Sequence, residues 1–356
     1  MKKVCVVGTS LGKGGAERST AMLSKILFDL RYEVYIVITK SDIDYKYAGN
    51  LFDLEREYGG GLTSFKKFKI LRSFFKHHNF DIIIDNRTRP SFLKEYILYN
   101  YIFLAKRKIS LVRSFYLKRY FPSSKILSKL IYNRNTTLVA VSKEIMRSIK
   151  INYNLQNVRQ IYNPVDINIT EARTTEHFDI DGKFILWYGR IENNVKNFDL
   201  LLNAYKKSIL LTKNIKLCII GQGKDVELLH EKINSLELKD RVYYVPFLKN
   251  PFPYVKRAIY TTLTSYYEGF PRVLIESLSY GTPVISVNCK SGPNEIIQNE
   301  YNGLLVENHN VSALANAFDR MIEDNILYLK CKNNAKTSVE KFSIENITKD
   351  WRELLI

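Results

Sequence analysis

The chain has 356 residues, 46% of them hydrophobic, which is enough to fill the cores of two ordinary domains and excludes a low-complexity protein. Residues 1–7 start like a signal peptide, but the apolar run stops at Gly8, and no apolar run approaches the roughly 18 residues that span a bilayer. We therefore expect a cytoplasmic protein. The net charge of +18 is uneven: residues 1–163 hold 30 Lys and Arg against 12 Asp and Glu, whereas residues 164–356 hold 24 against 24.

The first half of the chain alternates short apolar runs with segments of helical periodicity. A helix is predicted over residues 16–30, where apolar residues recur at helical spacing. Buried strands are predicted at residues 2–8, 33–39, 80–85, 109–112 and 137–142. Such alternation predicts a parallel sheet with helices on both faces.

Residues 161–182 are polar and without sustained periodicity, which indicates a linker between domains. Helices are then predicted from Phe198, over residues 225–236 and from about Pro271. The predicted strands are residues 184–189, 216–221, 241–247, 259–264 and 283–287. The sequence thus predicts an α/β protein with two doubly wound domains, 1–163 and 164–340, whose ligands bind at the carboxyl ends of the strands, in the cleft between the domains.

A glycine-rich loop, GTSLGKGGAERST, follows the first predicted strand. Gly12, Gly14 and Gly15 let the backbone approach a ligand closely, and the N-terminus of the next helix favours an anion there. The loop matches neither the P-loop nor the dinucleotide-binding pattern, and a purely structural turn explains it equally well.

Two cations follow the first strand of the second half, in WYGRIENNVKNFDLL. Arg190 and Lys196 lie in a strand-to-helix loop, where they can bracket a diphosphate. The alternative is that both are solvated surface cations.

The segment SYYEGFPRVLIESLSYGTP places Glu268 in the loop before a helix and Glu276 inside the helix. Free N–H groups near Gly269 and Phe270 can hold a phosphate. The Glu276 carboxylate suits the hydroxyls of a ribose, although it also stands four residues after Arg272, as a helix-surface ion pair requires.

We expect no metal site. The pairs Asp42/Asp44 and Asp179/Asp181 fall in polar turns, and the five His residues, His177 among them, show no ligand spacing. The four cysteines form no CxxC pair, which predicts reduced core residues.

EGFPRVLIE, with two Glu separated by seven residues, resembles the EX7E motif of retaining GT-B glycosyltransferases of family four. The motifs GGAER, VAVSKEI, IYNPVD, GR-x5-K-N, IIGQG, NPFPY and SGPNEI occur in that family's order and spacing, and the resemblance covers nearly the whole chain.

The resemblance implies roles for the candidate residues. Arg190 and Lys196 match the cations on the donor diphosphate, Glu268 the ligand of the transferred sugar, and Glu276 the ligand of the ribose. The donor site would also include Gly221 and Gly223 of IIGQG and the N–H groups of Gly269 and Phe270, with Gly14 and Gly15 near the reaction centre. The family pattern further implies transfer without a metal or cofactor, and a final helix, residues 341–356 around Trp351, that crosses back to the first domain.

One position departs from the family pattern. Many relatives carry a His at the end of a first-domain strand, where ISLVRSF places Arg113. An arginine is permanently charged and cannot act as a general base, but it can hold a donor or acceptor phosphate.

The expected activity is transfer of a hexose or N-acetylhexosamine, with retention, from a nucleotide sugar (UDP-linked by default) to a growing glycan. The leaving diphosphate would itself accept the proton of the acceptor hydroxyl. Alternatives are a sugar-nucleotide epimerase or phosphorylase on the same fold, or a basic nucleic-acid-binding protein. The last explains the total charge but not the neutral second half, so we expect no nucleic-acid partner.

Basic and aromatic residues are interleaved at residues 65–78 and 114–130. These stretches predict either amphipathic surfaces that bind the anionic inner face of the cell membrane, where a lipid-linked glycan is the acceptor, or core aromatics with a solvated basic side. Two such stretches in one domain favour the membrane interpretation.

Overall fold

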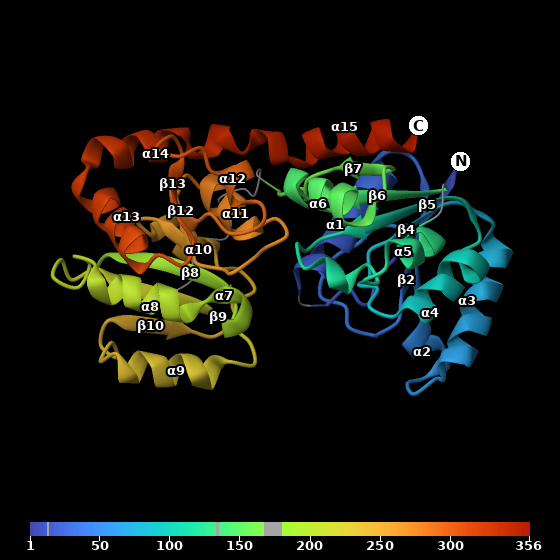
Figure 1. Cartoon of the computed structure of the whole chain (residues 1–356), viewed down its shortest axis with the longest axis horizontal. Helices are drawn as coiled ribbons and strands as arrows, with labels where there is room; N and C mark the ends of the chain where they lie inside the picture. The colour runs from blue at the N-terminus through green and yellow to red at the C-terminus, as the bar shows by residue number, and fades with distance from the viewer. Residues whose placement is uncertain (13, 133–134, 167–179) are drawn as a thin grey trace. The chain divides into compact units, whose positions relative to one another are not determined.

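The computed structural model describes residues 1–12, 14–132, 135–166 and 180–356, so His177 and Asp179 lie outside the described residues. The chain forms two compact units (Figure 1). Unit 1 comprises Met1–Pro164 together with Ile347–Ile356, and unit 2 comprises Val165–Asn346.

Unit 1 is built on a seven-stranded sheet in the order β3-β2-β1-β4-β5-β6-β7, in which every neighbouring pair is parallel. The strands are β1 Lys3–Val7, β2 Glu33–Ile38, β3 Asn50–Asp53, β4 Phe80–Asp85, β5 Ala105–Val112, β6 Thr136–Ala140 and β7 Val158–Gln160. The central strands are runs of Val and Ile buried on both faces, as parallel sheets require.

Helices connect the successive strands of unit 1 except β2 and β3. The helical segments are α1 Gly15–Asp29, α2 Leu54–Tyr58, α3 Ser64–His78, α4 Phe92–Ile97, η1 Leu98–Ile102, η2 Leu117–Arg119, α5 Lys125–Ile131 and α6 Lys143–Tyr153. Of these, α2, α3, α5 and α6 begin at a side-chain cap. Ser142, for example, accepts a hydrogen bond from Ile145 N at the start of α6.

Unit 2 repeats this architecture with a six-stranded parallel sheet in the order β10-β9-β8-β11-β12-β13. Its strands are β8 Phe184–Arg190, β9 Lys216–Gln222, β10 Val242–Val245, β11 Thr261–Leu263, β12 Val284–Val287 and β13 Gly303–Val306. Its helical segments are α7 Asn193–Lys196, α8 Phe198–Lys207, α9 Val226–Ser235, α10 Phe252–Arg257, α11 Arg272–Ser279, α12 Pro293–Ile296, α13 Val311–Glu323, α14 Asn325–Ser338 and η3 Glu340–Phe342. Two parallel, doubly wound sheets confirm the predicted fold class.

The last helix, α15, spans Ile344–Leu355, and its residues from Ile347 onward belong to unit 1. Ile347, Trp351 and Leu355 recur every four residues and are all buried, which gives α15 one continuous apolar face. Trp351 shares a small pocket with Leu23 of α1, so this face packs within unit 1.

The strand order of each sheet reverses at one point. In unit 1 the chain moves outward in opposite directions from β1 and β4, and in unit 2 from β8 and β11. The loops after these neighbouring strands therefore separate and leave room at the carboxyl edge, which is where open α/β sheets bind ligands.

Candidate functional site

Lys196 is held at the switch point of unit 2 by the short helix α7, which follows β8. Asn193 anchors α7, because its N–H donates to Asp225 Oδ2 at 2.7 Å and its Oδ1 accepts from Phe198 N at 2.8 Å. Asn197 then adopts a left-handed conformation (φ 55°), which ends α7 and starts α8. Arg190, the last residue of β8, is exposed at the same edge of the sheet.

Glu268 comes to the same switch point from the loop after β11. Lys196 Nζ lies 2.6 Å from Glu268 Oε1, and both side chains are largely buried, with 16% and 15% of their surface exposed. Ser265 Oγ donates to the same carboxylate oxygen at 2.7 Å. Thr264 Oγ1 donates to Lys196 O at 2.8 Å, which ties the two loops together. The structure thus brings together two predicted site residues that are 72 positions apart.

Glu276 lies within α11 and is buried, with 5% of its surface exposed. Arg272 Nε lies 3.5 Å from Glu276 Oε1, and Tyr188 of β8 donates to Glu276 Oε2 at 3.5 Å. The ion pair with Arg272 predicted from the i, i+4 spacing is therefore present, but its placement on the helix surface was wrong. The hydrogen bonds of Tyr188 to Val273 O and Glu276 join α11 to the end of β8.

Gly221 and Gly223 let the end of β9 pass close to the backbone that follows β8. A Cβ at Gly221 would lie 1.9 Å from Gly189 O, and a Cβ at Gly223 would lie 2.0 Å from Ile191 O. No side chain fits at either position, so these two glycines have a steric role whether or not they contact a ligand.

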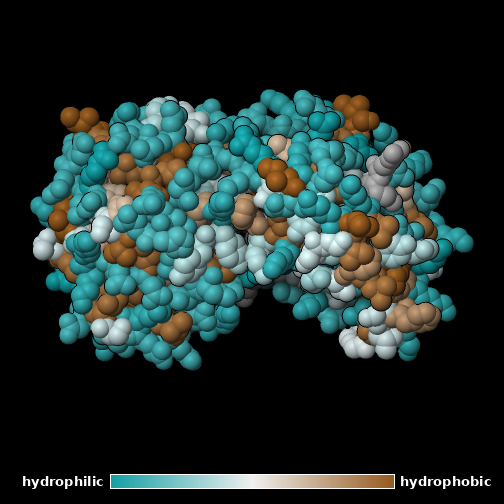
Figure 2. All heavy atoms as spheres, viewed as in Figure 1, coloured by the Kyte–Doolittle hydropathy of each residue, from teal (hydrophilic) through white to brown (hydrophobic). Residues whose placement is uncertain are grey.

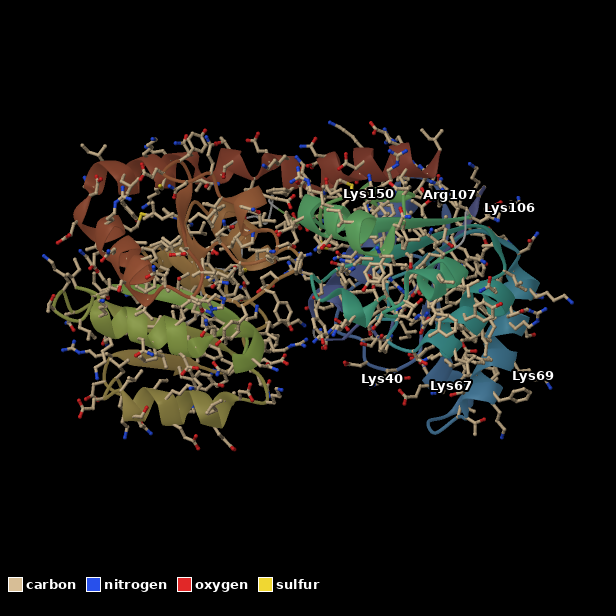
Figure 3. All side chains as sticks on the ribbon, in the orientation of Figure 1. Lys40, Lys67, Lys69, Lys106, Arg107 and Lys150 are labelled. Atoms are coloured by element: carbon tan, nitrogen blue, oxygen red, sulfur yellow. The ribbon has the colours of Figure 1, made fainter. Side chains whose placement is uncertain are left out.

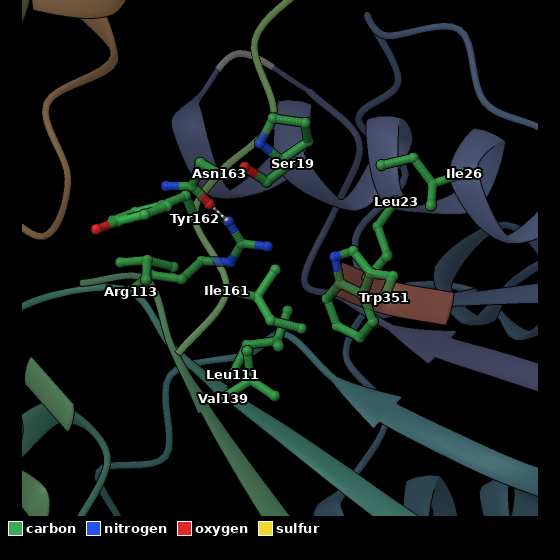
Figure 4. A pocket seen from close by; sticks show the side chains of 12 residues that line it. Ser19, Leu23, Ile26, Leu111, Arg113, Val139, Ile161, Tyr162, Asn163 and Trp351 are labelled. Atoms are coloured by element: carbon green, nitrogen blue, oxygen red, sulfur yellow. Dashed lines mark hydrogen bonds between the residues drawn. The ribbon is translucent and has the colours of Figure 1, made fainter. Parts of the chain in front are cut away.

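Asn86, which follows β4 at the switch point of unit 1, contacts both the predicted residue Arg113 and the first turns of α1. Asn86 Nδ2 donates to Ala16 O at 3.0 Å and to Thr20 Oγ1 at 2.5 Å, in the first turns of α1. Its Oδ1 accepts from Arg113 Nε, and Arg113 also donates to Asn163 Oδ1 at 2.5 Å (Figure 4). Asn86 therefore links Arg113 to the helix that begins at Gly15.

A small pocket lies beside Arg113 and Asn163, with a cavity volume of about 10 Å³, room for about one water molecule. Ser19 lines it, and within the described part of the chain the buried Ser19 Oγ has no hydrogen-bond partner. Figure 4 shows Trp351 beside Leu23 on the apolar side of this pocket. The space is too small for a sugar or a phosphate.

Four charged residues form a buried network under the same edge of unit 1. Arg87 bridges Asp85 and Glu95 at 2.9 Å each, and Arg89 is fully buried with its Nε on Tyr132 Oη at 2.8 Å. Burial alone would raise the pKa of Asp85, but the charges of Arg87 and Arg89 hold it below its ordinary value. Burial raises the pKa of Glu95. Asp85, Arg87 and Arg89 lie on either side of Asn86 in the chain, so this network fixes the loop that carries Asn86.

Sequence reasoning missed Asn86, Asn163, Tyr188 and Ser265. Asn163 belongs to the IYNPVD motif and Tyr188 to WYGR, so both lie in motifs that carried the family resemblance. Their contacts are visible only in the folded chain. Over residues 1–12, 14–132, 135–166 and 180–356, no group of three or more His, Cys, Asp or Glu is placed to hold a metal ion.

Comparisons with known proteins agree with this arrangement. The family model described as Glycosyltransferase Family 4 matches residues 13–169, and the model described as Glycosyl transferases group 1 matches residues 168–338. The two matches together run from residue 13 to residue 338. The chain belongs to glycosyltransferase family 4.

Two related proteins match the chain over all or nearly all of their length. A Campylobacter jejuni enzyme named N-acetylgalactosamine-N,N'-diacetylbacillosaminyl-diphospho-undecaprenol 4-alpha-N-acetylgalactosaminyltransferase is 29% identical over the full length of both chains. The amylovoran biosynthesis glycosyltransferase AmsD of Erwinia amylovora is 24% identical over 96% of both.

Solved structures show the same fold at low sequence identity. S. aureus TarM superposes with a TM-score of 0.79 at 16% identity, covering 99% of both chains. Anabaena HepE, crystallised with UDP and glucose, also gives a TM-score of 0.79, at 18% identity, covering 100% of this chain and 99% of HepE. The fold is therefore GT-B.

Proposed function

We propose that this glycosyltransferase transfers a hexose or N-acetylhexosamine, with retention, from a UDP-sugar to a lipid-linked growing glycan. The observation that carries the proposal is the meeting of Lys196 and Glu268, at 2.6 Å, at the switch point between β8 and β11. Lys196 would hold the donor diphosphate and Glu268 the hydroxyls of the transferred sugar. Glu276 would hold the ribose, and Arg190 would share the diphosphate charge.

The choice of UDP rests on relatives. TarM and HepE were both crystallised with UDP, although each resembles this chain only in fold. Within unit 2, a cation, a carboxylate and the loop before α11 lie at one edge of the sheet, which fits a ligand that combines a diphosphate with sugar hydroxyls.

Retention would follow from displacement on the face that the donor diphosphate leaves. The bond between the anomeric carbon and the diphosphate oxygen breaks, and a bond to the acceptor oxygen forms on the same face. The departing diphosphate oxygen takes the proton of the acceptor hydroxyl, so no protein base is needed. Lys196 and Arg190 stabilise the negative charge that grows on the leaving group, and this electrostatic effect supplies most of the catalysis.

The proposed acceptor is a lipid-linked glycan. The Campylobacter relative is named for a diphospho-undecaprenol acceptor, and AmsD for a polysaccharide. Unit 1 carries the whole excess of positive charge, and Figure 3 shows labelled cations distributed over several of its elements, among them Lys40, Lys67, Lys106 and Lys150. A positive surface of this kind favours an anionic partner.

Some of the apolar side chains in the two basic stretches, 65–78 and 114–130, are not available for membrane contact. Leu71 and Phe75 of α3 are buried in unit 1, as are Leu117 and Phe121, so a part of the apolar side chains in these stretches belongs to the core. Among the described helices, none has both the length and the apolar character needed to cross a bilayer.

An exposed apolar patch does remain on α4 and α5 (Figure 2), where Leu93, Ile126 and Leu130 are 66%, 73% and 46% exposed. We define this as the α4–α5 patch. Lys94, Lys125 and Lys129 lie on the same two helices and are exposed, so the patch combines apolar contacts with positive charge. Such a surface suits peripheral contact with an anionic leaflet.

The test is an assay of the purified protein against a panel of UDP-, GDP- and TDP-sugars, with and without a polyprenyl-diphosphate-linked glycan. We expect acceptor-dependent consumption of one UDP-sugar that EDTA does not abolish, and a product with the anomeric configuration of the donor by NMR. An epimerised nucleotide sugar formed without acceptor would indicate an epimerase, and release of a sugar 1-phosphate would indicate a phosphorylase. Tight DNA binding at physiological salt, with no donor consumed, would indicate a nucleic-acid-binding protein.

A further inference from the structure

The loop before α11, Glu268–Pro271, is held from one side by a second segment, Lys290–Gly292, which we call the strap. The strap follows β12 and leads into α12. Glu268 N donates to Lys290 O at 2.7 Å, and Ser291 N donates to Glu268 O at 3.3 Å. The two segments therefore pair like short parallel strands.

Ser291 makes a second bond to this loop through its side chain. Its Oγ, in a residue that is fully buried, donates to Gly269 O at 2.8 Å. The main chain and the side chain of Ser291 thus bind two successive carbonyl groups, those of Glu268 and Gly269.

Gly292 presses the strap against the same loop. Its φ of 103° is in the region that favours glycine, and a Cβ there would lie 2.7 Å from Pro271 Cδ and 3.1 Å from Phe270 Cα. The strap and the loop are therefore in direct contact along their length, and the loop has little freedom to shift toward the strap.

The two carbonyl bonds have a consequence for the opposite side of the loop. A trans peptide is planar, so its C=O and its N–H point in opposite directions. Fixing the Glu268 carbonyl on Ser291 directs the N–H of Gly269 away from the strap, and fixing the Gly269 carbonyl does the same for the N–H of Phe270. The Phe270 side chain is itself buried against Phe342, with ring centroids 5.2 Å apart, so the backbone is the part of Phe270 that can serve a ligand.

We propose that Ser291 is a positioning residue, which aims the N–H groups of Gly269 and Phe270 at the donor diphosphate. This inference rests on the proposed function, because it takes the nucleotide sugar as the anion that these groups meet. Two N–H groups that point to one side form an anion-binding site at the mouth of α11. Negative charge on the diphosphate grows as the sugar departs, so correctly aimed N–H groups act mainly on turnover.

The test compares Ser291→Ala with Ser286→Ala. Ser286 is a matched control, because it too is fully buried and its Oγ donates to a backbone carbonyl, Val287 O at 2.9 Å, but this bond is within β12 and not to the loop. We expect Ser291→Ala to lower kcat roughly 10- to 100-fold relative to Ser286→Ala, with a smaller loss of UDP affinity in calorimetry. The two variants should unfold at similar temperatures.

Hydrogen–deuterium exchange of the peptide covering residues 266–271 supplies a readout that needs no activity. Faster exchange in Ser291→Ala than in Ser286→Ala supports the positioning role, and equal exchange overturns it. If the wild type consumes a donor but the two variants have the same kcat, the positioning role is wrong and the proposed function stands. If the wild type neither binds UDP nor consumes any donor, the proposed function fails, and the exchange comparison alone decides whether Ser291 fixes the loop.

Discussion

Lys196 and Glu268 are each other's counter-ion, with Nζ and Oε1 2.6 Å apart and both side chains mostly buried. Each has a proposed ligand of its own: the diphosphate for Lys196 and the sugar hydroxyls for Glu268. In the absence of donor, Lys196 and Glu268 compensate each other's charge. A bound diphosphate would then share the Lys196 ammonium with Glu268. Removing either partner therefore affects the other, and substitutions at this pair have to be interpreted together.

Replacing Lys196 with Ala should leave a folded protein with greatly reduced transfer. Losing one charge-assisted contact to the leaving group costs about 3 kcal/mol in the barrier, on the order of 100-fold in kcat. Steady-state kinetics with the natural donor measure this loss.

The matched control for this substitution is Lys232→Ala. Lys232 also forms an ion pair in unit 2, with Asp199, but it lies on α9. We expect Lys232→Ala to keep nearly wild-type kinetics. Normal kcat in a well-folded Lys196→Ala variant would show that Lys196 does not act on the leaving group.

Substitutions of Glu276 and Glu268 should have different effects on UDP binding and on turnover. Glu276→Gln should weaken UDP binding by about tenfold, because the amide replaces a carboxylate that accepts hydroxyl hydrogen bonds. Glu268→Gln should mainly lower kcat, because UDP lacks the sugar that Glu268 contacts and its affinity changes only through the lost counter-ion of Lys196. Calorimetry with UDP and initial-rate kinetics distinguish the two, and the reverse pattern would mean that their roles are exchanged.

The central strands of both sheets could be predicted from sequence because they are short apolar runs, rich in Val, Ile and Leu, that are bounded by polar residues or glycine. Of the four outermost strands, β10 was predicted, but β3, β7 and β13 were not. NLFD of β3 and VRQ of β7 contain too few apolar residues to stand out, and GLLV of β13 is only four residues long. An edge strand pairs on one side only, so its sequence is less constrained than that of a central strand.

The candidate donor residues of unit 2 could be selected from the sequence because the two glutamates and the cations stand in motifs of fixed spacing. The Asn86–Arg113–Asn163 cluster was not, since its members come from three loops and are 27 and 50 residues apart. Short polar side chains on separate loops show no periodicity, and only the strand order brings them together. The ligand-binding roles assigned to all of these residues, and to Arg190, Gly14 and Gly15, stay predictions.

A side chain at Gly221 should destabilise unit 2. In Gly221→Ala the new Cβ would start 1.9 Å from Gly189 O, a backbone atom that can move only if β8 and β9 separate. We expect a loss of about 1–3 kcal/mol in the free energy of unfolding, measured by urea denaturation. Gly15→Ala is the control, since a Cβ there meets no atom within 4 Å. Equal stability of the two variants would contradict the close approach.

The buried network of unit 1 predicts a pH-dependent stability difference. The pKa of Asp85 is lowered in the folded chain, so its stabilising charge is fully present above the unfolded pKa of about 3.9 and is lost as the pH falls through the folded value. Asp85→Asn should cost about 3–5 kcal/mol at pH 7, because Arg87 and Arg89 lose a partner. The difference in the free energy of unfolding between wild type and Asp85→Asn should become smaller below about pH 4.

Glu95 acts with the opposite sign in the same network. Its raised pKa means that protonation favours the folded state, so its contribution is lost as the pH rises through the folded value. After burial, the charge of Asp85 is one of the causes of this raised pKa, so Asp85→Asn also changes the titration of Glu95, and the difference between wild type and Asp85→Asn reports the two carboxyl groups together. Chemical denaturation at several pH values between 3 and 7 gives this difference, and a gap that stays constant throughout would show that Asp85 is not the titrating group.

The last prediction concerns the membrane. Wild-type protein should float with anionic vesicles at low salt and remain unbound with neutral vesicles, because each cation near the surface contributes about 1 kcal/mol and salt screens that attraction. Reversing the charge of Lys94, Lys125 and Lys129 on the α4–α5 patch should abolish flotation, and Ile126→Ser in the same patch should weaken it by removing an exposed apolar contact. The control is the same reversal at Lys206, Lys207 and Lys213 of unit 2, which changes the net charge equally but leaves unit 1 intact.

If both triple variants lose flotation alike, total charge rather than unit 1 determines binding. If the wild type fails to float with anionic vesicles at low salt, the membrane proposal is wrong, and the enzyme acts on an acceptor in solution.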